Sequence, residues 1–326
     1  MKSILLFLIC LLLLSCNQHK KEATITKKIV IAHRGASGYL PEHTLESKAM
    51  AHAMNADFIE QDLVLSKDDI PVVIHDIYLD DVTNVAIKFP TRKRKDNRFY
   101  VIDFTFAELK TLQVSERFNP KTGKQVYKKR FPKGTGSFTL HSLQEEIELI
   151  QGLNTSTGKN IGIYPEIKDP EFHQKEGKNL TEIVLQVLAD YGYKTKKDNC
   201  ILQCFDALEL ERIRKELKSE LFLVQLIESP EKVKQLDHFA TYADGIGPWY
   251  KQILDKKVNG KFTFTSLVFD AHQLGLKVHP YTFRADALAE FATFEEMLET
   301  LLIEADIDGA FTDFPYVVVN FLKEKE

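Results

Sequence analysis

Short runs of apolar residues recur along the chain, and most are separated by 15 to 35 residues with the mixed polar and apolar content of helices. Strand, helix and strand in series predict a parallel sheet with right-handed crossover connections. The nine runs lie at residues 28–33, 57–65, 70–76, 161–168, 200–205, 221–227, 243–248, 277–283 and 308–315.

Two of these runs are too close together to be parallel neighbours. Only four residues, "SKDD" at 66–69, separate the second run from the third. So short a connection predicts an antiparallel hairpin, with His75 or Asp76 roughly opposite Glu60. The other eight runs then predict an α/β fold, the TIM (β/α)8 barrel, with this hairpin after its second strand.

A long insertion is expected after the hairpin, at about residues 77–160. Ninety residues separate His75 from Glu166, whereas a strand-helix-strand unit needs about thirty. From residue 81 to 140, 14 lysines and arginines face 5 acidic residues, a charge of +9 in a chain of net charge -4. The insertion is interpreted either as a solvated excursion or as a surface that attracts anionic phosphodiesters or phospholipids.

The first sixteen residues have the pattern of an export signal. A positive start, "MKS", precedes the apolar run "ILLFLICLLLL", which is too short to span a bilayer. A small residue before Cys16 resembles a bacterial lipoprotein cleavage site, so we expect a signal peptide over 1–16 and lipidation of Cys16. An ordinary signal peptide with a chance cysteine is the alternative. The prediction is a periplasmic or cell-envelope lipoprotein, anchored to a membrane through a spacer at 17–28, with the barrel at 29–326.

The composition is that of a globular protein. The 326 residues are 44% hydrophobic and 28% charged. The small net charge, without an aromatic-interleaved basic patch, excludes nucleic acid as an expected partner. Cys200 and Cys204 would lie about 13 Å apart on one strand, beyond the reach of a disulfide, so buried thiols are expected.

Polar residues interrupt the apolar runs where strands should end. Barrel enzymes carry their reactive groups at the carboxyl ends of the strands. The candidates are His33, Arg34, Glu60, Asp62, His75, Glu166 and Lys168.

Three of these candidates predict a metal site. Alternation along a strand puts Glu60 and Asp62 on one face, about 6.6 Å apart, and does the same for Glu166 and Lys168. Uncompensated carboxylates inside a barrel would be very unfavourable, and a divalent cation with oxygen ligands would compensate them. Such ligands favour Ca²⁺ or Mg²⁺ over zinc. The alternative is a structural ion-pair network, Glu166 with Lys168 and Glu60 with Arg34.

The two histidines and two positively charged side chains among the candidates predict the transfer of a phosphoryl group. Imidazole titrates near neutral pH, so His33 and His75 could act as a general acid and a general base. Arg34 and Lys168 supply fixed positive charge for a phosphoryl group.

These motifs together resemble the glycerophosphodiester phosphodiesterases. The segments "HRG", "PEHT", "EQD", "HD" and "PEIK" occur in that order, and the resemblance covers nearly the whole mature chain, including the long insertion of bacterial periplasmic members. It implies a TIM barrel with one divalent cation, Ca²⁺ as first choice and Mg²⁺ as second. It also implies hydrolysis of small-molecule glycerophosphodiesters, such as glycerophosphocholine and glycerophosphoethanolamine, to sn-glycerol 3-phosphate and an alcohol.

The resemblance also implies residue roles. His33 and His75 match the acid-base pair, and Glu60, Asp62 and Glu166 match the metal ligands. Arg34 and Lys168 match phosphate-contacting positions, and Glu42 matches an acidic position expected to orient its neighbours. His43 stands where many members have asparagine and receives no role.

Two other functions are alternatives. A phospholipase D or C acting on intact lipids would suit a membrane tether, and the insertion offers Phe89, Phe99 and Tyr100 for lipid contact or for inward packing. A non-catalytic glycerophosphodiester-binding lipoprotein would not need both histidines and three carboxylates. The sequence leaves open which histidine is the base, whether water or the substrate 2-hydroxyl attacks, and the oligomeric state, a homodimer included.

Overall fold

The computed structural model describes residues 27–325 of the chain. The predicted signal peptide, Cys16 and the spacer up to residue 26 lie outside these residues. Within the described range, no helix is long and apolar enough to cross a membrane.

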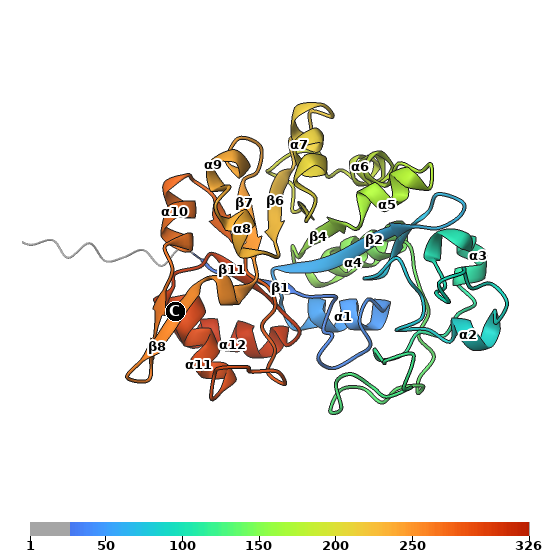
Figure 1. Ribbon diagram of the computed structural model, residues 1–326, viewed down its shortest axis with the longest axis horizontal. Helices are drawn as coiled ribbons and strands as arrows, with labels where there is room; N and C mark the ends of the chain where they lie inside the picture. Colours follow the sequence, from blue (N-terminus) through green and yellow to red (C-terminus); the bar gives the residue numbers. More distant parts are fainter. Residues whose placement is uncertain (1–26, 326) are drawn as a thin grey trace, which may run out of the picture.

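Eight parallel strands of the described residues form a nearly closed barrel (Figure 1). Their order around the sheet is β10-β7-β6-β5-β4-β2-β1-β11. The segment after β10 completes the circle, because Phe283 N–H donates to the Phe311 carbonyl and Phe311 N–H donates to the Pro280 carbonyl. The strands are β1 (Ile29–Ala32), β2 (Phe58–Leu65), β4 (Gly162–Ile167), β5 (Ile201–Cys204), β6 (Phe222–Ile227), β7 (Gly245–Pro248), β10 (Lys277–Val278) and β11 (Gly309–Thr312). The predicted TIM (β/α)8 barrel is confirmed.

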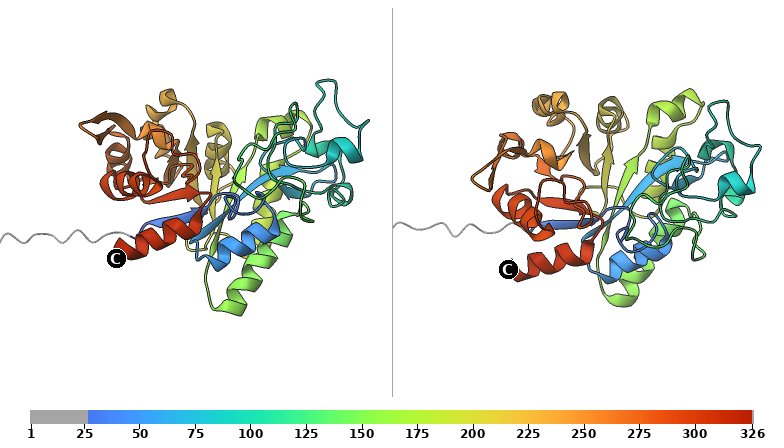
Figure 2. Two further views of the ribbon diagram at one scale, coloured as in Figure 1. Left: turned by 90° about the horizontal axis from the view of Figure 1, so that it is seen from below. Right: turned by 60° about the horizontal axis from the view of Figure 1, so that its bottom comes forward.

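Helices cover the outside of the barrel (Figure 2). The main apolar cluster fills the space between them and the strands, and a smaller cluster that includes Ile31, Tyr164 and Phe311 fills the interior. Most of the helices follow strands, as crossovers require. They are α1 (Leu45–Ala53), α4 (Leu143–Thr157), α5 (Pro170–Lys175), α6 (Leu180–Asp190), α7 (Ala207–Lys215), α8 (Pro230–Val233), α9 (Leu236–Phe239), α10 (Leu267–Gln273), α11 (Phe294–Leu298), which a π-helical turn continues over Glu299–Glu304, and α12 (Pro315–Lys325).

The predicted hairpin is also confirmed. Strand β3 (Pro71–Val73) pairs antiparallel with β2, with Leu63 opposite Val73 and Leu65 opposite Pro71. Continuing this register would place Asp76 opposite Glu60, one of the two alternatives expected. The hairpin therefore carries His75 toward the residues of β2.

The insertion forms its own small core beside the barrel. It contains α2 (Val85–Lys88), a 3-10 turn (Val101–Asp103) and α3 (Phe106–Leu109), and its buried residues form a second apolar cluster with Val64 and Val72 of the hairpin. Phe99 is buried in this cluster and Phe89 packs against it, while Tyr100 stacks on Phe172. Helix α4, within the range expected for the insertion, packs in the barrel's main cluster instead.

A second hairpin is present that the apolar runs did not predict. Strands β8 (Leu254–Val258) and β9 (Lys261–Phe264) pair antiparallel after a 3-10 turn (Tyr250–Gln252). Their side chains are mostly exposed, so no apolar run marks them. The turn residues Asn259 and Gly260 both have positive φ, and an Asn-Gly pair is a strong hairpin signal.

Candidate active site

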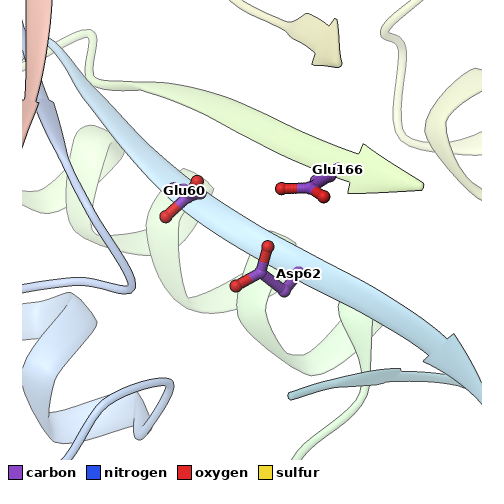
Figure 3. A group of neighbouring side chains, drawn as sticks. All are labelled: Glu60, Asp62 and Glu166. Atoms are coloured by element: carbon purple, nitrogen blue, oxygen red, sulfur yellow. The ribbon is translucent and has the colours of Figure 1, made fainter. Parts of the chain in front are cut away.

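Three buried carboxylates converge from two neighbouring strands (Figure 3). Glu60 and Asp62 project from β2 and Glu166 from β4, where Asp62 and Glu166 are register partners. One oxygen from each lies within 4.8 Å of the others. The structure thus brings together the three residues that the sequence predicts as metal ligands.

The electrostatics of this cluster fit a hard divalent cation. Burial, together with repulsion from Asp62 and Glu166, raises the pKa of Glu60 well above its ordinary value. Burial also raises the pKa of Glu166 to about 8, against the opposing charge of Lys168. Asp62 Oδ1 is buried without a hydrogen-bond partner. The protein's own charges therefore do not compensate all three carboxylates, and oxygen ligands of this kind suit Ca²⁺ or Mg²⁺.

His33 lies beside the cluster and is held by Asp313, the residue that follows the last strand. Its Nδ1 is 2.6 Å from Asp313 Oδ1, and its Nε2 is 3.8 Å from Glu60 Oε2. Burial and the charge of Arg34 lower the pKa of His33 to about 3. A neutral imidazole that donates Nδ1–H to a carboxylate presents the Nε2 lone pair to the site.

His75 is held in the same way from the hairpin side. Its Nδ1 is 2.8 Å from Asp76 Oδ1. Burial, with the charges of Arg34 and Lys168, lowers its pKa to about 4. The Nδ1 atom of each histidine is therefore held by an aspartate.

Arg34 and Lys168 lie at the edge of the carboxylates. The Arg34 backbone N–H donates to Glu60 Oε2 at 2.9 Å, and its Nη1 donates to Glu42 Oε1 at 3.0 Å. Lys168 Nζ is 2.8 Å from Glu166 Oε1. The sequence also allowed a structural ion-pair network. Its Glu166–Lys168 pair is present, whereas Glu60 accepts a hydrogen bond from the Arg34 backbone instead of pairing with its side chain.

The loop that carries His33 and Arg34 needs its glycines for packing. Gly35 has φ +88°, and a Cβ there would lie 2.4 Å from Ser47 Oγ on α1. A Cβ at Gly38 would lie 2.6 Å from the Phe314 ring. Larger residues would push the loop away from α1 and from the segment after β11.

Sequence reasoning missed several residues that contact the site. Asp76 and Asp313 received no role, although Asp76 follows His75 directly and Asp313 follows the last strand. His43 Nε2 is 2.6 Å from Asp62 Oδ2, and Gln203 Nε2 donates to Glu60 Oε1 at 3.0 Å. Gln203 lies inside a predicted strand among apolar residues. A polar side chain at such a position could have indicated a residue that faces the site.

Two adjoining cavities meet at these residues. The inner cavity, about 210 Å³, is lined by His33, Asp62 and Trp249 among others. The outer cavity, about 690 Å³, is lined by residues of α5 and by the start of α7. The residues that line both are His75, Glu166, Lys168 and Phe205. The site therefore opens into two cavities that share these four residues.

The barrel and this site define a phosphodiesterase of the TIM-barrel class. The chain matches the glycerophosphoryl diester phosphodiesterase family over residues 33–317 and belongs to that family. It is 46% identical to the glycerophosphodiester phosphodiesterase of Haemophilus influenzae, covering 95% of each chain. It is 37% identical to that of Treponema pallidum, covering 91% of this chain and 92% of the relative. The protein is therefore an enzyme, and a purely binding role is set aside.

Solved structures share the fold. A Silicibacter pomeroyi structure superposes with a TM-score of 0.70 at 23% identity, covering 92% of this chain and 94% of the other. An Oleispira antarctica phosphodiesterase in complex with the product sn-glycerol-3-phosphate gives a TM-score of 0.63 at 22% identity, covering 90% and 96%.

Proposed function

We propose that this enzyme hydrolyses glycerophosphodiesters, such as glycerophosphocholine and glycerophosphoethanolamine, to sn-glycerol 3-phosphate and an alcohol. One observation carries the proposal: a single site with two adjoining cavities is lined by all the predicted groups. These are two histidines that are each held by a carboxylate, three buried carboxylates, and the positively charged side chains of Arg34 and Lys168. A diester has two arms around one phosphate, and the two cavities offer space for both. The names of the curated relatives, and the product bound to the Oleispira protein, support the same substrate class.

Glu60, Asp62 and Glu166 would hold one divalent cation, with Ca²⁺ as first choice and Mg²⁺ as second. When bound, the cation would offset the charge of the phosphoryl oxygens and help to align the diester. Arg34 and Lys168 would contact the remaining phosphate oxygens, and Glu42 would keep the Arg34 side chain in place through their hydrogen bond.

His33 and His75 would divide the proton transfers. The Nε2 atom of one histidine removes the proton from the nucleophile, which is water or the substrate's own 2-hydroxyl. Attack by the 2-hydroxyl would form a cyclic phosphate, which water would then open to sn-glycerol 3-phosphate. The other histidine, once protonated, donates its proton to the departing alkoxide. Asp313 and Asp76 stabilise the imidazolium that forms on the histidine each contacts.

A product assay tests the proposal. The purified mature protein is incubated with glycerophosphocholine or glycerophosphoethanolamine, and released glycerol 3-phosphate is measured. EDTA should abolish turnover, and add-back of Ca²⁺ or Mg²⁺ should restore it and identify the ion. Turnover that persists in EDTA, after dialysis to remove bound metal, would refute the metal requirement.

Hydrolysis of intact phospholipids is a second candidate. Trp249 lines the inner cavity and is 42% exposed, and Leu208 lines the outer cavity and is 79% exposed. Apolar side chains at the mouth of a site could enter a lipid surface. Phe89 and Phe99 of the insertion pack inward and therefore do not offer lipid contacts. Parallel assays with phosphatidylcholine vesicles decide, because turnover confined to vesicles would favour the lipase activity.

We also propose export and lipidation at Cys16, on the sequence pattern alone. Cys16→Ala should move the protein from the membrane fraction to the soluble periplasmic fraction of its host and abolish labelling with radioactive palmitate. Unchanged fractionation and labelling would refute the anchor.

A further inference from the structure

Two arginines of the basic insertion turn inward instead of facing solvent. The side chains of Arg117 and Arg130 are only 16% and 4% exposed. The Arg130 guanidinium also lies over the Tyr127 ring, with Cζ 3.6 Å from the ring centroid. By contrast, the insertion's lysines at 93, 95, 121, 124, 128 and 129 are exposed. The two arginines therefore have a role distinct from a general attraction of anions to the surface.

Arg117 bridges the carboxylate behind His75 to the carboxylate beside Arg34. Its Nη1 donates to Asp76 Oδ2 at 2.8 Å, while Asp76 Oδ1 faces His75 Nδ1. On its other edge, Nε and Nη2 donate to the two oxygens of Glu42 at 3.0 and 2.7 Å. The Arg117 guanidinium thus binds both Asp76, which holds His75, and Glu42, which holds the proposed phosphate-contacting Arg34.

Arg130 makes the equivalent contact behind His33. Its Nη2 donates to Asp313 Oδ2 at 2.6 Å, while Asp313 Oδ1 faces His33 Nδ1. Its Nε and Nη2 also donate to both oxygens of Asp286, at 2.8 and 3.0 Å. A second arginine, Arg284 from the loop after β10, donates to the same Asp313 oxygen at 2.7 Å.

We propose that Arg117 and Arg130 are positioning residues for phosphodiester hydrolysis. Each fixes the carboxylate that holds one of the two histidines, so the insertion forms part of the frame of the active site. The inference rests on the proposed roles of His33 and His75. A planar guanidinium with several donors fixes the plane of a carboxylate, and that carboxylate in turn fixes the orientation and tautomer of the imidazole.

Removal of Arg117 should lower activity more than removal of Arg130. Arg117 is the arginine that contacts Asp76, so its loss frees that carboxylate to rotate. Asp313 keeps Arg284 when Arg130 is lost. Removing a group that orients a ligand or catalytic side chain typically lowers activity about 10- to 100-fold. We expect Arg117→Met to fall in that range and Arg130→Met to lose less, about three- to tenfold.

The experiment compares methionine and lysine variants of both arginines with a control from the same insertion. Arg94 pairs with Asp103 at 2.7 Å and Glu176 at 2.6 Å and contacts neither histidine, so Arg94→Met controls for loss of an arginine ion pair within the insertion. The readouts are kcat and KM for glycerophosphocholine, with thermal unfolding to monitor the fold. We expect kcat to fall in both Met variants, KM to change less than about threefold in Arg130→Met, and Arg94→Met to match the wild type. Lysine keeps the charge but not the fork of donors, so it should restore kcat only in part.

The outcomes separate this inference from the proposed function. His33→Asn and His75→Asn variants that keep wild-type kcat would refute the proposed function itself. If the histidine variants lose activity while folded Arg117→Met and Arg130→Met keep wild-type kcat, the positioning role is wrong. Loss of kcat in Arg94→Met equal to that of the others would assign the effect to general stability. Should the Met variants fail to fold, a folded Lys variant with wild-type kcat overturns the proposal.

Discussion

Lys48 and Glu146 form an ion pair that is fully enclosed between α1 and α4. Lys48 Nζ is 3.0 Å from Glu146 Oε1, and both side chains are 0% exposed. Lys48 also donates to the backbone carbonyl of Glu60, and Glu146 accepts from Gln61 and from His141 Nε2, both at 2.7 Å. The pair therefore supports β2 directly behind two of the proposed metal ligands.

The structure sets the size of the expected effect of Lys48→Met. Breaking a buried pair by removing one partner typically destabilises a protein by about 3–5 kcal/mol. Burial would raise the pKa of Glu146, but Lys48 and His141 hold it at about 2, against 4.5 for a free side chain. At about 1.4 kcal/mol per pKa unit, this difference corresponds to about 3 kcal/mol. This figure is the combined contribution of Lys48, His141 and Gln61, so we expect Lys48→Met to lose about 3 kcal/mol at pH 7, the lower end of the first range.

The pH dependence provides a second check. A carboxyl whose folded pKa is depressed contributes stability above its unfolded pKa and loses that contribution as the pH falls toward the folded value. The contribution of Glu146 should therefore still be about 2.6 kcal/mol at pH 4 and should shrink to about 1.4 kcal/mol at pH 3. The double variant Lys48→Met/Glu146→Gln, which leaves no charge behind, should lose less stability at pH 7 than Lys48→Met alone.

Urea unfolding of the mature protein at pH 7 and pH 3 measures these differences. Lys215→Met serves as control, since Lys215 forms an exposed pair with Glu211 four residues away and should change stability by less than about 0.5 kcal/mol. A loss below about 1 kcal/mol for Lys48→Met at pH 7, or an equal loss at both pH values, would refute the reasoning.

Three further predictions concern the site and its surroundings. His33→Asn and His75→Asn should each lower kcat by about 10²- to 10⁴-fold with an unchanged unfolding midpoint, measured by steady-state kinetics; near-wild-type kcat in both contradicts the acid-base assignment. Glu166→Gln should weaken Ca²⁺ binding in isothermal titration calorimetry by about tenfold or more, and unchanged affinity would exclude Glu166 as a ligand. Burial and the charge of Glu42 raise the pKa of Glu116 to about 8, so wild-type stability should fall as the pH rises from about 5 through 8. Glu116→Gln should therefore exceed the wild type in urea midpoint at pH 9 but match it at pH 5, and parallel pH profiles would contradict this.

Much of the fold could be predicted because its signals are local. Buried parallel strands appear as apolar runs, and the four-residue connection before β3 left a hairpin as the solution. The exposed strands β8 and β9 carry no such run, and only the Asn-Gly turn marks them. Cys200 and Cys204 are both buried and unbridged, as expected from their spacing.

The sequence alone determined which side chains meet at the end of β2 and β4. Alternation puts residues two apart on one face, and successive parallel strands of a barrel are expected to be neighbours, so the convergence of Glu60, Asp62 and Glu166 could be predicted; the register of Asp62 with Glu166 came from the pairing of β2 with β4. The motif around each histidine placed it at a strand end by the same local rule. These parts of the site follow from spacing along the chain.

Only the tertiary structure decided that Asp313 holds His33 and that two arginines of the insertion hold Asp76 and Asp313. Asp313 reaches His33 across 280 residues because the last strand closes the barrel beside the first. Arg117 and Arg130 reach Asp76 and Asp313 because the insertion folds back with its own core. The periodicity of the sequence does not predict such contacts. They depend on closure of the barrel and on the path of an irregular segment, and both are properties of the packed chain and not of a local stretch.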